Sequence, residues 1–284
     1  MGQILQRTGK LSPDEIGLVL RHQQQHGLRF GEAAIGLGLV SYEDVCYALS
    51  HQVTYPPEPT QPFNYPPELV AAVEPASDGA EALRSIRAQL SLRWFKAAQK
   101  CLAIAGINQG DGASTMIANL GISFAQLGKR TLIIDANLRR PAQDRLFGLS
   151  NDAGLSDILT ERVGLEDMIR ATPFKDLSLL PAGTPVFNPT ELVAHPSFQQ
   201  LLDTLAMRFD ILLLDSPAFM SVADAVSIAG VAGGVMFVAR KHKTSLNHAR
   251  GANQLLIGTD IQVVGSILLD FQCRGIAAET RPAA

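Results

Sequence analysis

A glycine-rich loop between an apolar run and a helix holds the residues with the clearest chemical meaning. The apolar run covers residues 102–105, Gly110 and Gly112 follow, and the next helix opens at Ser114 and Thr115. Glycines allow several backbone N–H groups to turn toward one anion, and a helix N-terminus favours negative charge. The pattern predicts a phosphate-binding loop for a nucleotide. Its expected contacts are Gly110, Asp111, Gly112, Ala113, Ser114 and Thr115.

This loop departs from the usual sequence G-x-x-x-x-G-K-[ST] at two positions. Ile107 stands at the first glycine and Ala113 at the lysine that would contact the outer phosphates, whereas Ser114 keeps the hydroxyl that binds magnesium. The sequence therefore predicts a phosphate cradle without its own cation. Three other lysines are interpreted as surface charges away from the loop, although one could partly replace the missing charge: Lys129, Lys241 and Lys243.

Two carboxylates follow apolar runs elsewhere in the chain. Asp135 ends the run at 131–134, and Asp215 ends the run at 211–214. The carboxyl ends of parallel strands are where such sheets bind their ligands, and carboxylates are ligands that magnesium prefers. We therefore expect Ser114, Asp135 and Asp215 to form a magnesium site, with the two carboxylates as the catalytic groups if the protein is an active enzyme.

The order of apolar runs and helical segments indicates the fold class. Strands that read as continuous apolar runs and alternate with helices are typical of a parallel sheet covered on both faces. We predict an α/β fold, a P-loop NTPase-type parallel sheet with helices on both faces, preceded by a small all-α repeat domain. The predicted strands are 131–135, 177–180, 211–215, 235–239 and 263–269, and the predicted helices are 116–127, 190–206, 224–231 and 248–257.

A series of further motifs accompanies the loop in order along residues 81–270. They are Glu81-x-x-Arg84-x-x-Arg87, Asp135-x-Asn137-x-Arg139, Gly154-Leu155-Ser156, Leu180-Pro181-Ala182-Gly183, Asn188-Pro189-x-Glu191-Leu192, Asp215-Ser216-Pro217 and Asp224-Ala225. Together these motifs resemble those of the bacterial tyrosine kinases of capsule and exopolysaccharide synthesis. The resemblance implies a cytoplasmic P-loop domain that works with a polysaccharide chain-length determinant or export protein of the inner membrane.

The resemblance also indicates where this chain departs from its family. Ala113 replaces the lysine, Asn137 replaces the second carboxylate of D-x-D, and Asp270 stands where relatives have an asparagine near the base. The last tyrosine is Tyr65, so no C-terminal tyrosine cluster can accept phosphate. Because phosphoryl transfer depends on positioning and charge neutralisation, the loss of one charge is expected to cost on the order of 10³-fold or more. We expect ATP or ADP binding with magnesium but weak or absent phosphotransfer.

Two alternatives remain from the sequence. The chain could be an active ATP-dependent protein-tyrosine kinase that controls polysaccharide chain length and phosphorylates a partner. A partitioning-type ATPase of the same broad superfamily is a weaker alternative, because the signature lysine early in that loop is absent.

The net charge and the hydropathy of the chain indicate which partners and which cellular location to expect. A net charge of −3 gives no basic field for a nucleic acid polymer, and the apolar stretch 229–239 is too short to span a bilayer. We therefore expect a cytoplasmic protein held at the inner membrane by its partner. By the family resemblance, Glu81, Arg84 and Arg87 are expected to mediate homo-oligomerisation, although a solvated helix face with local ion pairs is the alternative.

The N-terminus contains two copies of one pattern displaced by 29 positions. Gly9 matches Gly38, and Ser12 matches Ser41 at the start of a predicted helix with a capping box in each copy. This spacing is similar to the N-terminal domain of type II secretion and pilus ATPases, in which the doubled motif binds cyclic di-GMP. The resemblance implies a ligand site at Gly2, Leu5, Gly9, Leu11, Ile16, Leu20, Gln23, Arg29, Phe30, Gly31, Gly38, Val40, Val45, Leu49 and Gln52.

A helical docking module whose repeat serves only packing is the alternative interpretation of the N-terminal repeat. After it, prolines at 56, 57, 59, 62, 66, 67 and 75 favour extended polyproline geometry and indicate a semi-rigid linker. We therefore predict three parts: a helical repeat domain at 1–54, a linker at 55–76 and a P-loop domain at 77–284.

Overall fold

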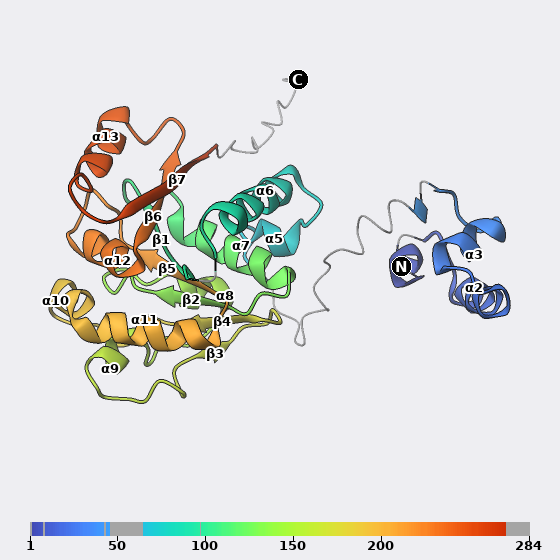
Figure 1. Ribbon diagram of the computed structural model, residues 1–284, viewed down its shortest axis with the longest axis horizontal. Helices are drawn as coiled ribbons and strands as arrows, with labels where there is room; N and C mark the ends of the chain where they lie inside the picture. Colours follow the sequence, from blue (N-terminus) through green and yellow to red (C-terminus); the bar gives the residue numbers. More distant parts are fainter. Residues whose placement is uncertain (1, 8, 43, 46–64, 97, 271–284) are drawn as a thin grey trace, which may run out of the picture. The chain divides into compact units, whose positions relative to one another are not determined.

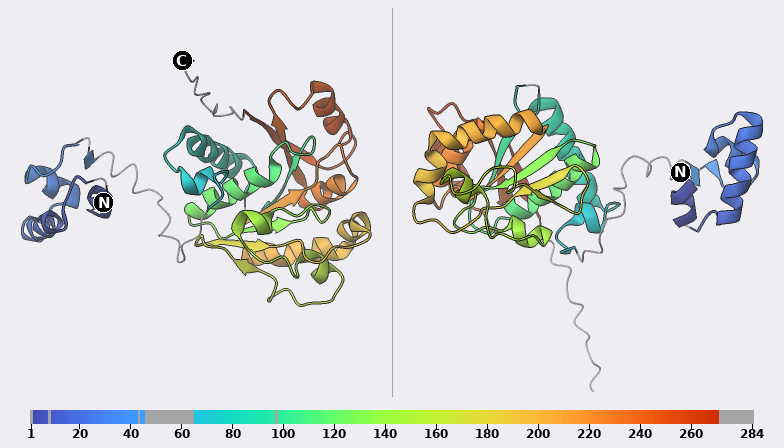
Figure 2. Two further views of the ribbon diagram at one scale, coloured as in Figure 1. Left: turned by 180° about the vertical axis from the view of Figure 1, so that it is seen from behind. Right: turned by 90° about the horizontal axis from the view of Figure 1, so that it is seen from below.

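The computed structural model in Figures 1 and 2 describes residues 2–7, 9–42, 44–45, 65–96 and 98–270. The chain divides into two compact units, Met1–Pro57 and Glu58–Ala284. Within the described ranges, no helix combines the length and the apolar character needed to cross a bilayer.

The N-terminal unit is helical. Its described helices are α1 (Gly2–Arg7), α2 (Pro13–His26) and α3 (Phe30–Gly36). Side chains from both copies of the repeat form its core: Leu5, Leu11, Val19, Ala33, Ala34, Val40 and Val45.

Both predicted capping boxes are confirmed. The Ser12 hydroxyl accepts from the N–H of Glu15 at 3.3 Å, and the Glu15 carboxylate accepts from the N–H of Ser12 at 2.7 Å. The second copy repeats this arrangement between Ser41 and Asp44, at 3.1 and 3.0 Å. Lys10 forms an ion pair with Asp44 at 3.1 Å, so the turn of the first copy is joined to the helix start of the second.

The second unit is built on a seven-stranded sheet with the order β3-β4-β2-β5-β1-β6-β7. All neighbouring strands are parallel except β3 and β4, which confirms the predicted α/β class. The strands are β1 (Cys101–Gly106), β2 (Thr131–Asp135), β3 (Arg170–Ala171), β4 (Leu177–Leu180), β5 (Ile211–Ser216), β6 (Gly234–Arg240) and β7 (Gln262–Leu269).

Helices cover both faces of this sheet (Figure 2). Alternate residues of β1 show the division: Leu102 and Ile104 pack with α6 and α7, whereas Ala103 and Ala105 pack with α11 and α12. The helices are α5 (Val70–Val73), α6 (Asp78–Arg93), α7 (Ala113–Gln126), α8 (Gln143–Phe147), α9 (Leu155–Leu159), α10 (Pro189–Ala194), α11 (Pro196–Arg208), α12 (Asp224–Ala232) and α13 (Leu246–Gln254).

The structure corrects the single helix predicted at 190–206, which is divided into α10 and α11. His195 has extended backbone angles, φ −70° and ψ 140°, and Pro196 begins α11. Proline disfavours a helical conformation of the residue before it and cannot donate a hydrogen bond inside a helix, so the break falls at this dipeptide. The predicted strands agree with β2, β4, β5, β6 and β7 to within one residue at each end.

The structure also corrects the C-terminal end of the predicted linker. Residues 65–75 pack on the P-loop unit, where the Asn119 side chain accepts from the N–H of Ala71 at 2.9 Å and donates to the carbonyl of Glu68 at 2.9 Å. Leu69 is fully buried, and the Tyr65 and Phe174 rings lie 5.1 Å apart. This segment therefore belongs to the second unit, while residues 55–64 lie outside the described residues.

Candidate functional site

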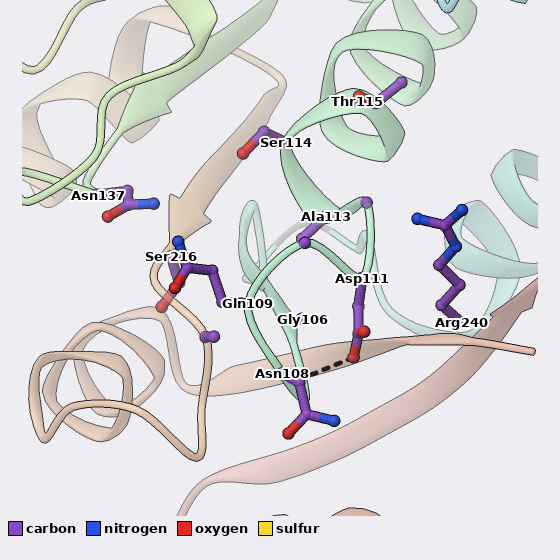
Figure 3. Close-up of a pocket in the computed structure, with 13 residues that line it drawn as sticks. Gly106, Asn108, Gln109, Asp111, Ala113, Ser114, Thr115, Asn137, Ser216 and Arg240 are labelled. Atoms are coloured by element: carbon purple, nitrogen blue, oxygen red, sulfur yellow. Dashed lines mark hydrogen bonds between the residues drawn. The ribbon is translucent and has the colours of Figure 1, made fainter. Parts of the chain in front are cut away.

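The loop after β1 surrounds a cavity of about 380 Å³, shown in Figure 3. Gly110 and Gly112 have φ angles of +76° and +97°, in the left-handed region that favours glycine. The loop connects directly to α7, a helix of 14 residues whose free N–H groups begin at the cavity. All six predicted loop residues line it, as do Gly106, Asn108, Gln109, Asn137, Ser216, Ala218 and Arg240.

Asp111 holds the shape of the loop. Its side chain is almost completely buried, and one carboxylate oxygen accepts from the N–H of Asn108 and from the hydroxyl of Thr244, each at 2.8 Å. These bonds fix the loop against itself and against the chain that follows β6. Asp111 therefore acts mainly on the loop's conformation.

Ala113 occupies the helix position where the motif has its lysine. Its methyl group lines the cavity and carries no charge. Figure 3 shows it between Ser114 and Thr115 on one side and the glycine loop on the other. The first turn of α7 thus offers backbone N–H groups and two hydroxyls to an anion, but no ammonium.

The two predicted carboxylates lie side by side at the ends of neighbouring strands. Asp135 and Asp215 are register partners on β2 and β5, and both are fully buried. Asp135 accepts three backbone N–H groups, from Asn137 at 3.2 Å, Ala142 at 2.9 Å and Gln143 at 3.0 Å. Asp215 accepts from the Gln143 side chain at 2.6 Å.

Burial governs the ionisation of this pair. Burial raises the pKa of Asp135, and the neighbouring charge of Asp215 raises it further. Burial also raises the pKa of Asp215, while hydrogen bonds from Gln143 and Ser114 lower it in part. The pair therefore favours a state at neutral pH in which it retains one proton in the absence of a cation.

A magnesium ion fits this arrangement. Among the described residues, Oδ1 of Asp215 is buried and has no hydrogen-bond partner, so one carboxylate oxygen remains for a ligand. Ser114, which lies close enough to influence the Asp215 pKa, supplies a hydroxyl on the cavity wall. Oxygen donors of this kind, completed by water and phosphate oxygens, are typical of magnesium sites.

Gln143 is a site residue that the sequence analysis missed. It is fully buried, and its side-chain amide donates to Asp215 and, at 3.0 Å, to the backbone carbonyl of Ser114. It connects the start of α7 to the carboxylate pair. The five-residue helix α8 that carries it has no recognisable motif, so only the structure identifies this role.

Asn137 and Arg139, the last two defined residues of the predicted D-x-N-x-R motif, have different surroundings. Asn137 lines the cavity. Arg139 instead donates to Asp224 at 2.7 Å and to Thr190 at 3.1 Å, so it joins the end of β2 to α10 and α12. Arg139 therefore connects three of the motifs that carry the family resemblance: its own D-x-N-x-R, the N-P-x-E-L motif that contains Thr190, and the D-A motif that begins at Asp224.

The interpretation of Lys243 as a surface charge away from the loop was wrong. Its ammonium donates to the carbonyl of Gln109 at 2.8 Å and lies 4.0 Å from the Asp111 carboxylate. Lys241, by contrast, pairs with Asp270 at 2.6 Å. Asp270 is not among the residues that line the cavity, so the structure does not bring it to the phosphate loop.

The residues predicted to mediate oligomerisation have partners within their own chain. Arg84 donates to Glu81 at 2.7 Å and to the carbonyl of Pro75 at 2.8 Å. Arg87 donates to the carbonyl of Ser123 at 2.7 Å. Their role between subunits stays a prediction.

The candidate ligand residues of the N-terminal repeat are divided between its core and its surface. Leu5, Leu11, Val40 and Val45 are core side chains, whereas Arg29 is exposed. Leu49 and Gln52 lie outside the described residues. A separate cavity of about 340 Å³ contains none of the predicted residues, and Leu18, Arg21, His22, Gln25, Leu37 and Leu39 line it.

Several known proteins are similar to this chain in sequence. Residues 99–260 match the family described as AAA domain. The chain is 32% identical over 200 residues to tyrosine-protein kinase YwqD of Bacillus subtilis, covering 70% of this chain and 84% of that protein. It is 34% identical to a putative tyrosine-protein kinase in the cps region of Klebsiella pneumoniae, covering 62% of this chain but 24% of that longer protein.

Two solved structures are also similar to this chain. The chimerical protein CapA2B2 has 30% identity and a TM-score of 0.68 over 81% of this chain and 98% of that chain. The BceF tyrosine kinase domain has 31% identity and a TM-score of 0.64 over 80% of this chain and 86% of that one.

The parallel sheet, the loop after β1 and the carboxylates that end β2 and β5 define a P-loop kinase-like α/β domain. Within this class, the chain belongs to the bacterial tyrosine-protein kinase family.

Proposed function

We propose that this chain is a regulator of exopolysaccharide synthesis or export that responds to cyclic di-GMP. In this proposal its tyrosine-kinase-like domain binds nucleotide but transfers phosphate weakly or not at all. One observation carries the second statement: the methyl group of Ala113 forms the cavity wall where the P-loop motif places a lysine.

The remaining site supports nucleotide binding. Backbone N–H groups at the start of α7 would bind the phosphates, and Ser114 and Asp215 would hold magnesium, with Asp135 beside them. When bound, magnesium neutralises charge on the phosphate oxygens. Transfer also needs stabilisation of the charge that develops in the transition state, and one missing group of this kind costs on the order of 10³-fold.

An active tyrosine kinase is the second candidate, and one observation favours it. Lys243 reaches the phosphate loop from outside the motif, so the loop does not lack a nearby ammonium. In that case we expect the acceptor to be a tyrosine of a partner protein, because no tyrosine follows Tyr65 in this chain to form a C-terminal acceptor cluster.

Labelled-phosphate transfer to a tyrosine polymer distinguishes the two candidates. The native chain should show background transfer, Ala113→Lys should raise it by on the order of 10²-fold or more, and Ala113→Met should stay at background. The methionine variant matches the lysine in length without its charge. Transfer by the native chain that is well above background and equal to that of Ala113→Lys would overturn the weak-activity proposal in favour of the active kinase.

The response to cyclic di-GMP is supported by the paired helix starts of the N-terminal unit and by the exposed side chain of Arg29, which precedes α3. A guanidinium can pair with phosphate or stack on a guanine. To regulate, the ligand must bind one state of the protein more tightly than another. We propose that those states differ in the oligomerisation of the P-loop unit through Glu81, Arg84 and Arg87.

Calorimetric titration of cyclic di-GMP tests this part of the proposal. Binding is expected for the full chain and not for a chain that begins at Glu58, where the second compact unit starts. Arg29→Ala should weaken binding, whereas Arg21→Ala, which changes the separate cavity, should not. Absence of binding to the full chain would leave the repeat as a docking module.

A partner at the inner membrane completes the proposal. A polysaccharide chain-length determinant or export protein would hold this chain at the cytoplasmic face. Co-purification with such a membrane protein is the expected result, and it should persist in Ala113→Lys because the loop faces a nucleotide in this proposal.

A further inference from the structure

The connection between β6 and α13 crosses the phosphate loop. In the sheet, β6 lies next to β1, with Gly106 opposite Val238. The chain that leaves the end of β6 at Arg240 therefore emerges beside the chain that leaves β1. Residues 241–245 cover this distance before α13 begins at Leu246.

Four hydrogen bonds fasten this connection and its neighbours to the loop. Each bond joins a different loop residue. They are Lys243 to the Gln109 carbonyl at 2.8 Å, Thr244 to Asp111 at 2.8 Å, the His248 ring with the Asn108 side chain at 2.7 Å, and the Ile107 N–H to the Val238 carbonyl at 2.9 Å.

A tight turn fixes the position of the Lys243 side chain. The N–H groups of Lys243 and Thr244 donate to the carbonyl of Arg240 at 3.1 and 2.9 Å. His242, inside the turn, has a φ of +60°, and the Thr244 hydroxyl accepts from the N–H of Arg240 at 2.8 Å. The backbone at the base of the lysine is thus determined by several bonds.

The ammonium of Lys243 lies directly against the loop. A Cβ atom added to Gly110 would be 2.8 Å from this nitrogen. Gln109 and Gly110 precede the helix start, on the part of the loop farther from α7, and both line the cavity. Backbone N–H groups next to the helix bind the inner phosphates of a nucleotide, so a cation at Gln109 and Gly110 would face the outer ones.

The contacts of the Lys243 ammonium among the described residues leave hydrogen-bond donors for a ligand. An ammonium has three donors, and in the described part of the chain the Gln109 carbonyl takes one of them. The Asp111 carboxylate, at 4.0 Å, is an ion-pair partner without a hydrogen bond. Arg240, at the base of the turn, itself lines the cavity (Figure 3).

We infer that Lys243 binds the outermost phosphate of the nucleotide and supplies, from the β6–α13 connection, the charge that Ala113 does not. This inference rests on the proposed nucleotide binding. It differs from a purely structural role, in which the lysine would only hold the loop in shape.

Binding of fluorescent ATP and ADP analogues to the full chain, with magnesium, tests the inference. Lys243→Ala should weaken ATP binding about tenfold, the value of one charged hydrogen bond, and should weaken ADP binding less. Lys129→Ala is the matched control, because this exposed lysine follows the C-terminal end of α7, does not line the cavity and should leave both affinities unchanged. Adding Ala113→Lys to Lys243→Ala should restore ATP affinity, since the charge returns to the cavity.

The outcomes separate this inference from the proposed function. Equal ATP affinity in the native chain and in Lys243→Ala, or equal losses for ATP and ADP, would overturn the inference and leave nucleotide binding intact. No binding of either analogue to the native chain would overturn the proposed nucleotide binding itself. The fluorescence of Trp94, which is buried in this unit, checks that each variant is folded.

Discussion

Replacing Asp135 with asparagine should stabilise the P-loop unit at neutral and alkaline pH. Burial raises the pKa of Asp135 to about 8, with a further contribution from the charge of Asp215. For an acid whose pKa is raised by folding, stability is complete below the unfolded pKa, near 4, and is lost as the pH rises toward the folded value. The native unit should therefore lose stability between about pH 4 and pH 8. Asp135→Asn should lose less, because only Asp215, whose pKa burial also raises, still titrates in this range.

The structure sets the size of this effect. The difference between an ordinary carboxyl pKa and about 8 corresponds to roughly 5 kcal/mol at pH 8. Asparagine can keep the bonds from Ala142 and Gln143 on its oxygen but must give up the one from Asn137, at a cost of about 1–2 kcal/mol. The net gain is roughly 3 kcal/mol at pH 8, or about 6–12 °C in Tm, and close to zero at pH 5.

Thermal unfolding of the full chain, followed by tryptophan fluorescence, is the appropriate assay. Trp94 is the single tryptophan and is buried in the P-loop unit, so the signal reports this unit alone. Asp210→Asn is the control with the opposite sign, because the ion pair with Arg130 lowers the pKa of Asp210. A variant Asp135→Asn that is less stable than the native chain at pH 8, or a Tm difference independent of pH, would refute the reasoning.

Two further predictions concern the contacts outside the site. Asn119→Ala removes the hydrogen bonds to Ala71 and Glu68 and should destabilise the P-loop unit by about 2–3 kcal/mol. The loss should appear as a lower unfolding temperature, followed by Trp94 fluorescence, and as faster proteolysis near residue 70. An unchanged unfolding temperature would contradict the packing of segment 65–75 on this unit. In the N-terminal unit, the backbone N–H of Ser41 is the main cause that lowers the pKa of Asp44 to about 2, so the helix start loses this stabilisation as the pH falls from about 4 toward 2. Far-UV circular dichroism should show a helix loss of the native chain in this pH range that is smaller in the variant with Asp44→Ala, where only other carboxylates such as Glu15 still titrate.

Most of the second unit could be predicted from local sequence patterns. Buried parallel strands must be apolar on both faces, so runs such as 131–135 and 211–216 are visible without long-range information. Helix starts with capping boxes are equally local, and both were found. The break at Pro196 also had a local signal, the proline itself, which the apolar periodicity across 190–206 obscured.

The errors concern features that depend on long-range packing. The segment 65–75 has the composition of a linker, but Asn119, on α7, supplies the hydrogen bonds that its backbone needs. Gln143 belongs to the site because α8 places it under the start of α7, and nothing in its neighbours along the chain indicates this. Each of these contacts joins residues at least 29 positions apart.

The position of Lys243 follows from the order of the strands. With the order β2-β5-β1-β6, the loop after β1 has the ends of β2 and β5 on one side and the end of β6 on the other. Figure 3 accordingly shows Asn137, which follows β2, and Arg240, which ends β6, on opposite sides of the loop. In the proposed nucleotide complex, magnesium held by the carboxylates would approach the phosphate from the first side. Lys243, on the β6–α13 connection, would approach from the second side. This topology therefore permits the loop lysine to be lost while a bound phosphate would still lie between two positive charges.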